Sequence, residues 1–344
     1  MNNSPLVSIL IPVYSVEKYI ERCARSIFEQ TYDNLEYIFV DDCTPDNSIA
    51  ILEKVIKDYP ERKKNVRIIH HPKNRGIAAT RNTAVDACKG TFLFFVDSDD
   101  WLEKNAIDLL VERQQETDAD VVTASFYRHS IIGGNEIIEE SLVPEKEQDR
   151  MQTLKVMLEY GSVVALWNRL IRRSLYREHN IKCVEGVDAG EDLMVTPRLI
   201  YHSQKVASCN SITYHYNQTN PNSYVNVYSS SWEMQLQLIR ATLLNVDFFN
   251  DKEEFLCEAM NKQLVERLKM ILELNFRNNN HHGYNRVLAM LDDTNRKYWP
   301  LIGWNRQLKR WIDHHYIISR ITFPLRKMRG EILLSNKKSL LNRQ

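Results

Sequence analysis

The first 130 residues alternate between short apolar runs and longer amphipathic stretches, and this alternation restricts the fold more than any other feature. Nearly continuous apolar character is typical of strands that are covered on both faces. We expect such strands at residues 7–14, 35–42, 66–71, 90–97 and 120–127. Helices are expected at 46–59, 77–88 and 103–117, and around a stripe formed by Tyr19, Ile20, Cys23, Ile27 and Phe28. The repeated βαβ pattern predicts an α/β fold with an open, mostly parallel sheet and helices on both sides.

The rest of the chain is expected to be mainly helical. Residues 151–202 read as helical, residues 205–216 as a strand, and residues 230–249 and 253–276 as long helices. We predict a first domain at 1–228, with a donor-binding part at about 1–130 and an acceptor-side part at about 131–228. A helical C-terminal extension is predicted at 229–344, ending in a basic amphipathic tail.

Charge and cysteine usage limit the class of protein. The chain has 45 basic and 45 acidic side chains, so a nucleic-acid protein coated in positive charge is not expected. No run reaches the roughly 18 apolar residues that a membrane-spanning helix needs, and the N-terminus does not read as a signal peptide. The six cysteines are scattered singly, which favours a reduced, cytoplasmic location.

The basic residues are concentrated near the C-terminus. Residues 300–344 hold ten Lys or Arg against Asp313 and Glu331, interleaved with Trp, Tyr, Ile and Phe. Such a segment is typical of proteins that bind the anionic inner surface of the cell membrane. A helical face packed on the protein, with its charges in water, is the equal alternative.

Carboxylates follow directly after the predicted strand at 90–97. Asp97, Asp99 and Asp100, with Ser98 between them, stand at the carboxyl end of the strand, the edge where open α/β sheets bind ligands. If the extended geometry persists, Asp97 and Asp99 point to the same side and offer oxygen ligands to Mg²⁺ or Mn²⁺. A diphosphate is the natural further ligand of such a cation. The alternative is that Asp99 or Asp100 caps a helix beginning near Glu103.

Two further segments suit the same edge. Asp41 and Asp42 end the second strand, and a carboxylate there can accept hydrogen bonds from a base or a ribose, although a simple turn is nearly as good an explanation. Residues 72–82 follow the third strand, where Asn74 and Gly76 supply turn chemistry, and Arg75 and Arg81 supply guanidinium groups. Basic groups at a helix start suit a phosphate.

Several nucleotide-binding and hydrolase motifs are absent. The sequence has no G-x-G-x-x-G after its first strand, no G-x-x-x-x-G-K-[ST] and no G-x-S-x-G. These absences argue against a dinucleotide dehydrogenase, a P-loop NTPase and a serine hydrolase. What remains is a nucleotide diphosphate held by a metal ion and arginine.

Taken together, these stretches resemble the family 2 glycosyltransferases of the GT-A fold. The resemblance covers roughly residues 5–225 and includes "VSILIPVYSVEKYIERCARSIFEQTYDNLEYIFVDDCTPDNS", "NRGIAATRN", "GTFLFFVDSDDW", "LWNRLIRR" and "GEDLMV". It implies a GT-A-type nucleotide-sugar-binding domain. It also implies an inverting transfer of a sugar from a nucleoside-diphosphate sugar, with a UDP-sugar preferred, to a hydroxyl of a glycan or lipid-linked oligosaccharide in cell-surface polysaccharide synthesis.

The resemblance also implies roles for individual residues. It places Pro12, Val13, Tyr14 and Glu17 at the base, Asp41 on the base edge, Arg81 near the diphosphate, Asp97 at the ribose or metal, and Asp99 on the metal. Asp42, Asn74, Gly76 and Ser98 complete the expected donor site. Glu191 and Asp192 match the family's acidic pair, and Asp192 is the expected general base, because a single displacement needs a carboxylate opposite the leaving diphosphate.

Some residues have no assigned role, some differ from the family pattern, and alternative functions stay open. Trp101, Trp167 and Asn168 are candidates for an acceptor floor, whereas His215 and Ser223 are left without a role. Ser15, Cys43, Pro45 and Arg169 depart from the usual family pattern, and these departures concern the base and sugar preference. The alternative functions are a metal-dependent phosphatase or nucleotidyltransferase and a non-catalytic scaffold that binds nucleotide sugars.

Overall fold

The computed structural model describes residues 4–143, 146–160, 164–221, 223, 231–278, 280, 282–287 and 289. The chain forms two compact units, Met1–Leu256 and Cys257–Gln344. The first unit contains every described strand and the helices up to α10, and most of α11 (Glu254–Arg277) belongs to the second. The domain boundary at 228 stays a prediction, and the basic tail at 300–344 lies outside the described residues.

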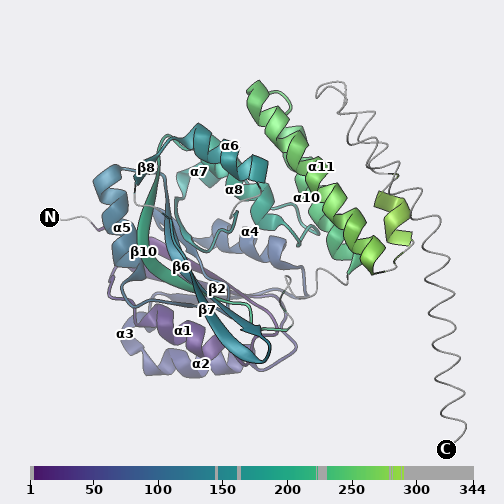
Figure 1. Cartoon of the computed structure of the whole chain (residues 1–344). Helices are drawn as coiled ribbons and strands as arrows, with labels where there is room; N and C mark the ends of the chain where they lie inside the picture. Colours follow the sequence, from purple (N-terminus) through teal and green to yellow (C-terminus); the bar gives the residue numbers. More distant parts are fainter. Residues whose placement is uncertain are drawn as a thin grey trace, which may run out of the picture. The chain divides into compact units, whose positions relative to one another are not determined.

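One twisted sheet organises the first unit (Figure 1). Its main path runs β3-β2-β1-β4-β9-β6-β10-β5, and β7 and β8 pair with β6 and β10. The bounds are β1 (Val7–Val13), β2 (Leu35–Asp41), β3 (Val66–His70), β4 (Phe92–Phe95), β5 (Trp101–Leu102), β6 (Val121–Ile132), β7 (Asn135–Ser141), β8 (Lys146–Gln148), β9 (Arg169–Arg172) and β10 (Val206–Asn217). Strands β1 to β4, β6 and β10 run in one direction, and β9 runs against them between β4 and β6. The predicted α/β fold with a mostly parallel sheet is confirmed.

Helices cover both faces of the sheet. Those of the first unit are α1 (Ile20–Phe28), α2 (Ser48–Asp58), α3 (Pro60–Lys63), α4 (Ile77–Ala87), α5 (Ala106–Thr117), α6 (Arg150–Tyr160), α7 (Ser174–Glu178), α8 (Glu191–His202) and α10 (Trp232–Phe249). Alternate residues of β1 and β2, such as Ile9, Ile11 and Phe39, share one apolar cluster with α1, α2 and α5. Helix α4 packs on β1 and β2 outside this cluster. All five strands expected in the first 130 residues are present. The apolar runs of β2 and β4 are buried along their whole length and that of β1 nearly so, whereas the edge strand β3 is only half-buried.

The prediction of helix throughout 151–202 is wrong in its middle. Residues 169–172 of "LWNRLIRR" form β9, which pairs antiparallel with both β4 and β6. Leu170 and Ile171 are fully buried there, one on each face of the sheet. The run is too short for its spacing to distinguish a central strand from a helix.

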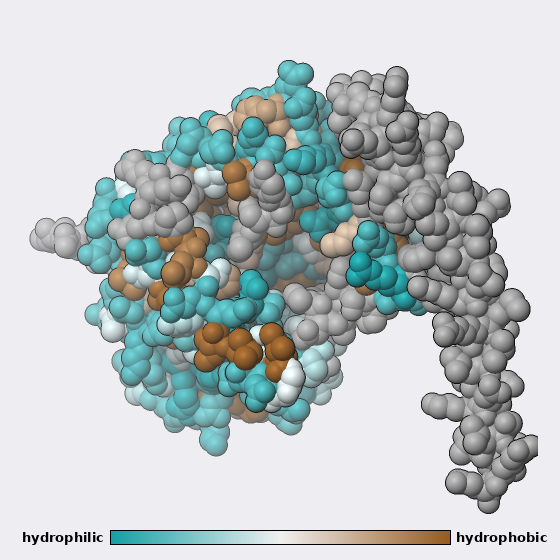
Figure 2. All heavy atoms as spheres, in the orientation of Figure 1, coloured by the Kyte–Doolittle hydropathy of each residue, from teal (hydrophilic) through white to brown (hydrophobic). Residues whose placement is uncertain are grey.

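A hairpin extends the sheet at the carboxyl end of β6. Strands β6 and β7 are joined through Gly133 and Gly134, both with positive φ, the conformation that a two-residue hairpin turn requires. Ile131, Ile132 and Ile138 around this turn are more than half exposed. Figure 2 shows apolar side chains gathered over this hairpin on an otherwise mostly hydrophilic face. Among the described residues, no helix is both long enough and apolar enough to cross a membrane.

Candidate active site

The carboxyl ends of the parallel strands bring the predicted acidic segments together. Asp42 donates its amide to the carbonyl of Val13 at 3.1 Å, and His71 donates its amide to the carbonyl of Asp41 at 2.8 Å. The loops after β1, β2 and β3 are therefore adjacent. The side chains continue this pairing, because His70 Nδ1 lies 2.8 Å from Asp41 Oδ2 and His71 Nδ1 lies 2.6 Å from Asp42 Oδ1.

Asp41 and Asp42 differ in their surroundings. Both carboxylates are buried, that of Asp42 more fully than that of Asp41, with 4% against 12% of the side chain exposed. Asp42 accepts hydrogen bonds from the amides of Arg75 and Gly76 as well as from His71. It therefore fixes the loop that enters α4. Asp41 accepts from the amide of Thr44 and borders His70, whose side chain is 57% exposed. Asp41 is the better placed of the two to meet a ligand.

The residues expected at the base lie at the end of β1, where Val13 pairs with Asp41, and in the loop that follows. Pro12 and Val13 end β1, and Tyr14 beside them is 46% exposed. Glu17 accepts hydrogen bonds from the amide and side chain of Asn47, which ties the first loop to the start of α2. Cys43 has φ +57, so the turn after Asp42 keeps the left-handed conformation although the glycine of the usual pattern is missing.

The Asp97–Asp100 segment forms a turn and not a continued strand. The amide of Asp100 donates to the carbonyl of Asp97 at 3.0 Å, so Asp97 and Asp99 are not related by strand geometry. Asp100 does not cap a helix, since α5 begins at Ala106. It is buried and accepts hydrogen bonds from the hydroxyl of Tyr214 at 2.7 Å and the amide of Asn217 at 2.7 Å. Asp100 thus holds the turn against β10.

Asp99 is a half-buried carboxylate with few partners among the described residues. Asn220 Nδ2 donates to Asp99 Oδ2 at 2.8 Å, and among the described residues no Lys or Arg lies within ion-pair distance of Asp99. Burial raises the pKa of Asp99 to about 6, and the neighbouring Asp97 carboxylate adds to the shift. A bound cation would therefore stabilise the ionised carboxylate of Asp99.

The donor set suits a hard divalent cation. Asp97 uses one oxygen for Arg81 and keeps 26% of its side chain exposed, and Asp99 offers its second oxygen. The described residues contain no cluster of three or more His, Cys, Asp or Glu with the arrangement of a complete metal site. Mg²⁺ and Mn²⁺ bound through one or two carboxylates take their other ligands from water and phosphate, so Asp97 and Asp99 fit such an ion.

Arg81 joins the β4 carboxylates to the acidic pair of α8. Its side chain is 4% exposed, with Nη2 3.1 Å from Asp97 Oδ1 and 3.3 Å from Glu191 Oε1, and Nη1 bonded to Asp192 Oδ1. Burial lowers the pKa of Arg81, but the three carboxylates outweigh burial and raise it overall. The guanidinium therefore stays charged, and it connects α4 to Asp192, which lies 111 positions after Arg81 in the sequence.

The environment of Asp192 suits a proton acceptor. Asp192 Oδ2 accepts the amide of Leu166 at 3.3 Å, and the side chain is 17% exposed. Burial raises the pKa of Asp192 and of Glu191, while Arg81 acts in the opposite direction on both. A carboxylate with a raised pKa is a stronger general base than an ordinary one.

The cationic groups expected at a phosphate are engaged with carboxylates of the chain. Arg75 Nη2 lies 2.7 Å from Glu185 Oε1, and Asp188 Oδ1 accepts the amide of Ala78 at 3.0 Å in the first turn of α4. Gly76 has φ +88, and a Cβ on it would lie 2.3 Å from Asp188 Oδ2. The segment before α8 therefore covers the start of α4.

The acceptor candidates fall into two groups. Trp167 is buried and stacks on Tyr214 and Tyr216, with ring centroids 4.6 and 5.0 Å apart. Asn168 is also buried and donates to the carbonyl of Ala124. Trp101 lies between Arg22, whose guanidinium carbon is 3.4 Å from the ring centroid, and His215.

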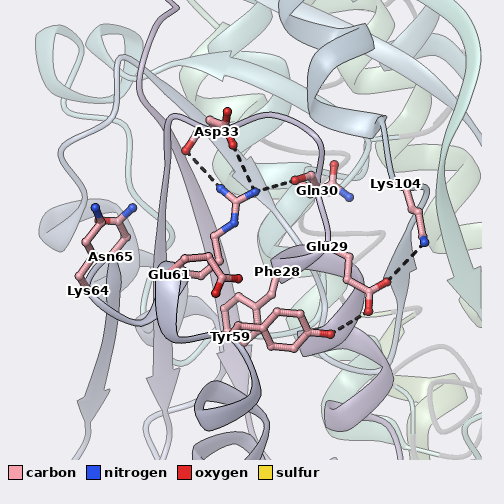
Figure 3. Close-up of a pocket in the computed structure, with 10 residues that line it drawn as sticks. Phe28, Glu29, Gln30, Asp33, Tyr59, Glu61, Lys64, Asn65 and Lys104 are labelled. Carbon is pink, nitrogen blue, oxygen red and sulfur yellow. Dashed lines mark hydrogen bonds and ion pairs between the residues drawn. The ribbon is translucent and has the colours of Figure 1, made fainter.

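A polar hollow of about 590 Å³ lies at the opposite edge of the sheet (Figure 3). Asp33 and Asn65 in its lining come just before β2 and β3. Two ion pairs lie in its lining, Arg62 Nη2 with Asp33 Oδ1 at 3.6 Å and Lys104 Nζ with Glu29 Oε2 at 3.9 Å. This hollow is remote from the carboxylates of the candidate site.

Comparison with known proteins decides the family. Residues 8–179 match the model of the family described as Glycosyl transferase family 2. The chain belongs to this family. It is 32% identical to the uncharacterized glycosyltransferase EpsJ of Bacillus subtilis (strain 168) over 68% of this chain and 67% of EpsJ. It is 42% identical to the chondroitin synthase of Escherichia coli, but only over 31% of this chain and 15% of that protein.

Solved structures support the GT-A-type architecture of this family 2 member. The crystal structure of S. aureus TarS 1-349 in complex with UDP-GlcNAc matches with a TM-score of 0.61 and 19% identity, covering 83% of each chain. At this identity the match concerns the fold alone. The family implied by the sequence motifs and the predicted fold class are both confirmed.

Several residues of the site were not predicted from the sequence. His70 ends β3 and His71 follows it, so both could have been found by the same carboxyl-edge reasoning as Asp41 and Asp42. Asp188 and Asn220 lie in irregular segments, and nothing in their local pattern indicates their contacts with α4 and Asp99. These contacts depend on tertiary packing.

Proposed function

We propose that this protein is an inverting, metal-dependent glycosyltransferase that transfers a sugar from a UDP-sugar to a hydroxyl of a glycan or lipid-linked oligosaccharide. One observation carries the proposal: a single buried guanidinium, that of Arg81, joins Asp97 at the end of β4 to Asp192 at the start of α8. A donor-side carboxylate and a candidate base therefore meet at one point.

The donor is assigned to the edge formed by β1, β2 and β4. Tyr14 offers an exposed aromatic face to a base, and Asp41 offers a carboxylate to its N–H groups. UDP is the preferred nucleotide because the structurally similar TarS was crystallised with UDP-GlcNAc. A divalent cation held by Asp99 and Asp97 would neutralise the diphosphate and ease its departure.

The transfer step needs a base on the acceptor side. The acceptor oxygen attacks the anomeric carbon, the bond to the diphosphate breaks, and the acceptor proton passes to the Asp192 carboxylate. Arg81 holds one oxygen of Asp192 in place, and its charge opposes the rise in the pKa of this carboxylate that burial causes. Glu191 shares the same guanidinium and supports the same arrangement.

The acceptor class is proposed from one relative and from one exposed surface. Part of the chain matches a chondroitin synthase, which is consistent with a glycan acceptor. The exposed isoleucines of the β6–β7 hairpin extend from the same edge as Asp99, and they suit the apolar part of a lipid-linked acceptor. A cytoplasmic location, peripheral at the inner membrane face, is the accompanying proposal and is based on the basic sequence of residues 300–344.

A donor screen tests the proposal. UDP-, GDP- and dTDP-sugars are added with Mn²⁺, Mg²⁺ or a chelator, and both the melting temperature and nucleotide release are measured. We expect a UDP-sugar to raise the melting temperature only with the cation, and Asp192→Asn to keep this shift while losing transfer. Binding without hydrolysis or transfer would favour the non-catalytic scaffold. Release of inorganic phosphate or pyrophosphate without sugar transfer would favour the phosphatase or nucleotidyltransferase.

A further inference from the structure

Helix α10 contacts the segment that carries the acidic pair. This helix lies outside residues 8–179, the part that matches the family model. Gln237 Oε1 on α10 accepts two backbone hydrogen bonds, from the amide of Asp188 at 2.8 Å and from that of Ala189 at 2.9 Å. One side-chain oxygen thus satisfies two consecutive amides just before Glu191.

The contact continues on both sides of the acidic pair. Gly190 has φ +93, and a Cβ on it would lie 2.9 Å from Leu238 Cδ1 and 3.0 Å from the Cβ of Ala241. After the pair, Asn245 Nδ2 donates to the carbonyl of Leu193 at 2.5 Å. Residues before and after Glu191 and Asp192 are therefore fixed to the same helix.

The other side of this segment is fixed to the donor half. The carboxylate of Asp188 accepts the amide of Ala78 at the start of α4, and α4 also carries Arg81. Residues 187–190, which we call the bridge segment, thus connect α10 with α4. Val187 and Ala189 of the bridge segment are buried, whereas Asp188 and Gln237 are half-buried.

We propose that Gln237 is a positioning residue for the base Asp192. It holds the bridge segment between α10 and α4, and it thereby sets the Asp192 carboxylate relative to Arg81 and the donor. This inference rests on the proposed function. Displacing a catalytic group by about 1 Å can lower the rate about a hundredfold, so the fixed position has a direct effect on turnover.

Two substitutions separate positioning from mere packing. Gln237→Met keeps the length of the side chain but removes the acceptor for both amides. Gln237→Glu keeps an acceptor oxygen at the same place and is the rescue variant. Arg240→Ala on the exposed side of the same helix is the control for general effects on α10.

The measurements use the full chain. Hydrogen exchange of the backbone over residues 187–195 is followed without donor, UDP affinity is measured with Mn²⁺, and kcat and KM are measured with the UDP-sugar that the donor screen identifies. For Gln237→Met we expect faster exchange and a kcat lowered about tenfold or more, with UDP affinity and donor KM within about twofold of wild type. Gln237→Glu and Arg240→Ala should remain close to wild type in hydrogen exchange, UDP affinity, kcat and KM.

Two results would overturn the inference. One is unchanged exchange and unchanged kcat in Gln237→Met; the other is a fall in kcat matched by an equal loss of UDP affinity and melting temperature, which indicates general misfolding. A wild-type protein that turns over no nucleotide sugar would instead refute the proposed function. In that case the exchange measurement still decides whether Gln237 holds the bridge segment.

Discussion

Replacing Asp99 by Asn should stabilise the metal-free protein. Asp99 is half-buried, has no ion-pair partner among the described residues, and is repelled by Asp97 and Asp100. Asn keeps the shape of the side chain and can still accept from Asn220. Its pKa is raised from 3.8 to about 6. At about 1.4 kcal/mol per unit, the ionised form destabilises the fold by about 1 to 3 kcal/mol once partial exposure is allowed for.

The pH dependence follows from the direction of this shift. Because the folded pKa lies above the unfolded one, the folded state holds the Asp99 proton more tightly, and stability is lost as the pH rises through about 6. Asn does not titrate. The advantage of Asp99→Asn should therefore be small near pH 4, close to the unfolded pKa, and complete near pH 8.

Urea unfolding with a chelator, at pH 4 and pH 8, measures this difference. Each kcal/mol should also raise the melting temperature by about 2 to 4 °C in a unit of this size. Asp33→Asn is the control, since the Asp33 side chain is 99% exposed. A variant that is no more stable than wild type at pH 8, or equally more stable at both pH values, would refute the reasoning.

Three further predictions concern the same site. Arg81→Met should destabilise the protein by about 3 to 5 kcal/mol, because it leaves three carboxylates without their shared cation. Urea unfolding measures this loss, and a loss below about 1 kcal/mol would contradict the role of Arg81. The rate constant kcat should fall on acidification, with a midpoint above the ordinary aspartate pKa near 4, because burial raises the pKa of Asp192 and the base must be ionised. A kcat that does not change down to pH 4 would exclude Asp192 as the general base. Cys43→Gly should stabilise the protein by up to about 1 kcal/mol in urea, since it relieves a left-handed conformation, and a destabilised variant would show that the Cys43 side chain packs favourably.

The sheet and its ligand-binding edge could be predicted because their signals are local. Continuous apolar runs identify β1, β2 and β4, and the direction of the strands then places Asp41 and Asp97 at one edge. Strand β9 was missed because a four-residue apolar run has no distinctive period. Arg81 was expected beside a phosphate, but its partners include Glu191 and Asp192, which are over a hundred positions away in the sequence. No spacing rule reports such a contact.

The role of Gln237 could not have been predicted from the sequence. In the sequence it is one polar residue of an amphipathic helix, and a solvent-facing position would explain it equally well. Its role appears only when the amides of Asp188 and Ala189 are seen to share its oxygen. Contacts made by irregular backbone depend on the packed structure and are not predicted by periodicity.

The central claim is that Asp97 and Asp99 hold a cation that binds the diphosphate of a nucleotide sugar. The most direct measurement is a crystal structure of the protein grown with UDP and MnCl₂, with diffraction collected at the manganese absorption edge. The account predicts one anomalous peak within bonding distance of an Asp99 carboxylate oxygen and of the UDP phosphates, with the base beside Tyr14 and Asp41. A nucleotide bound elsewhere, or UDP bound at this edge with no manganese peak at Asp99, would contradict the account.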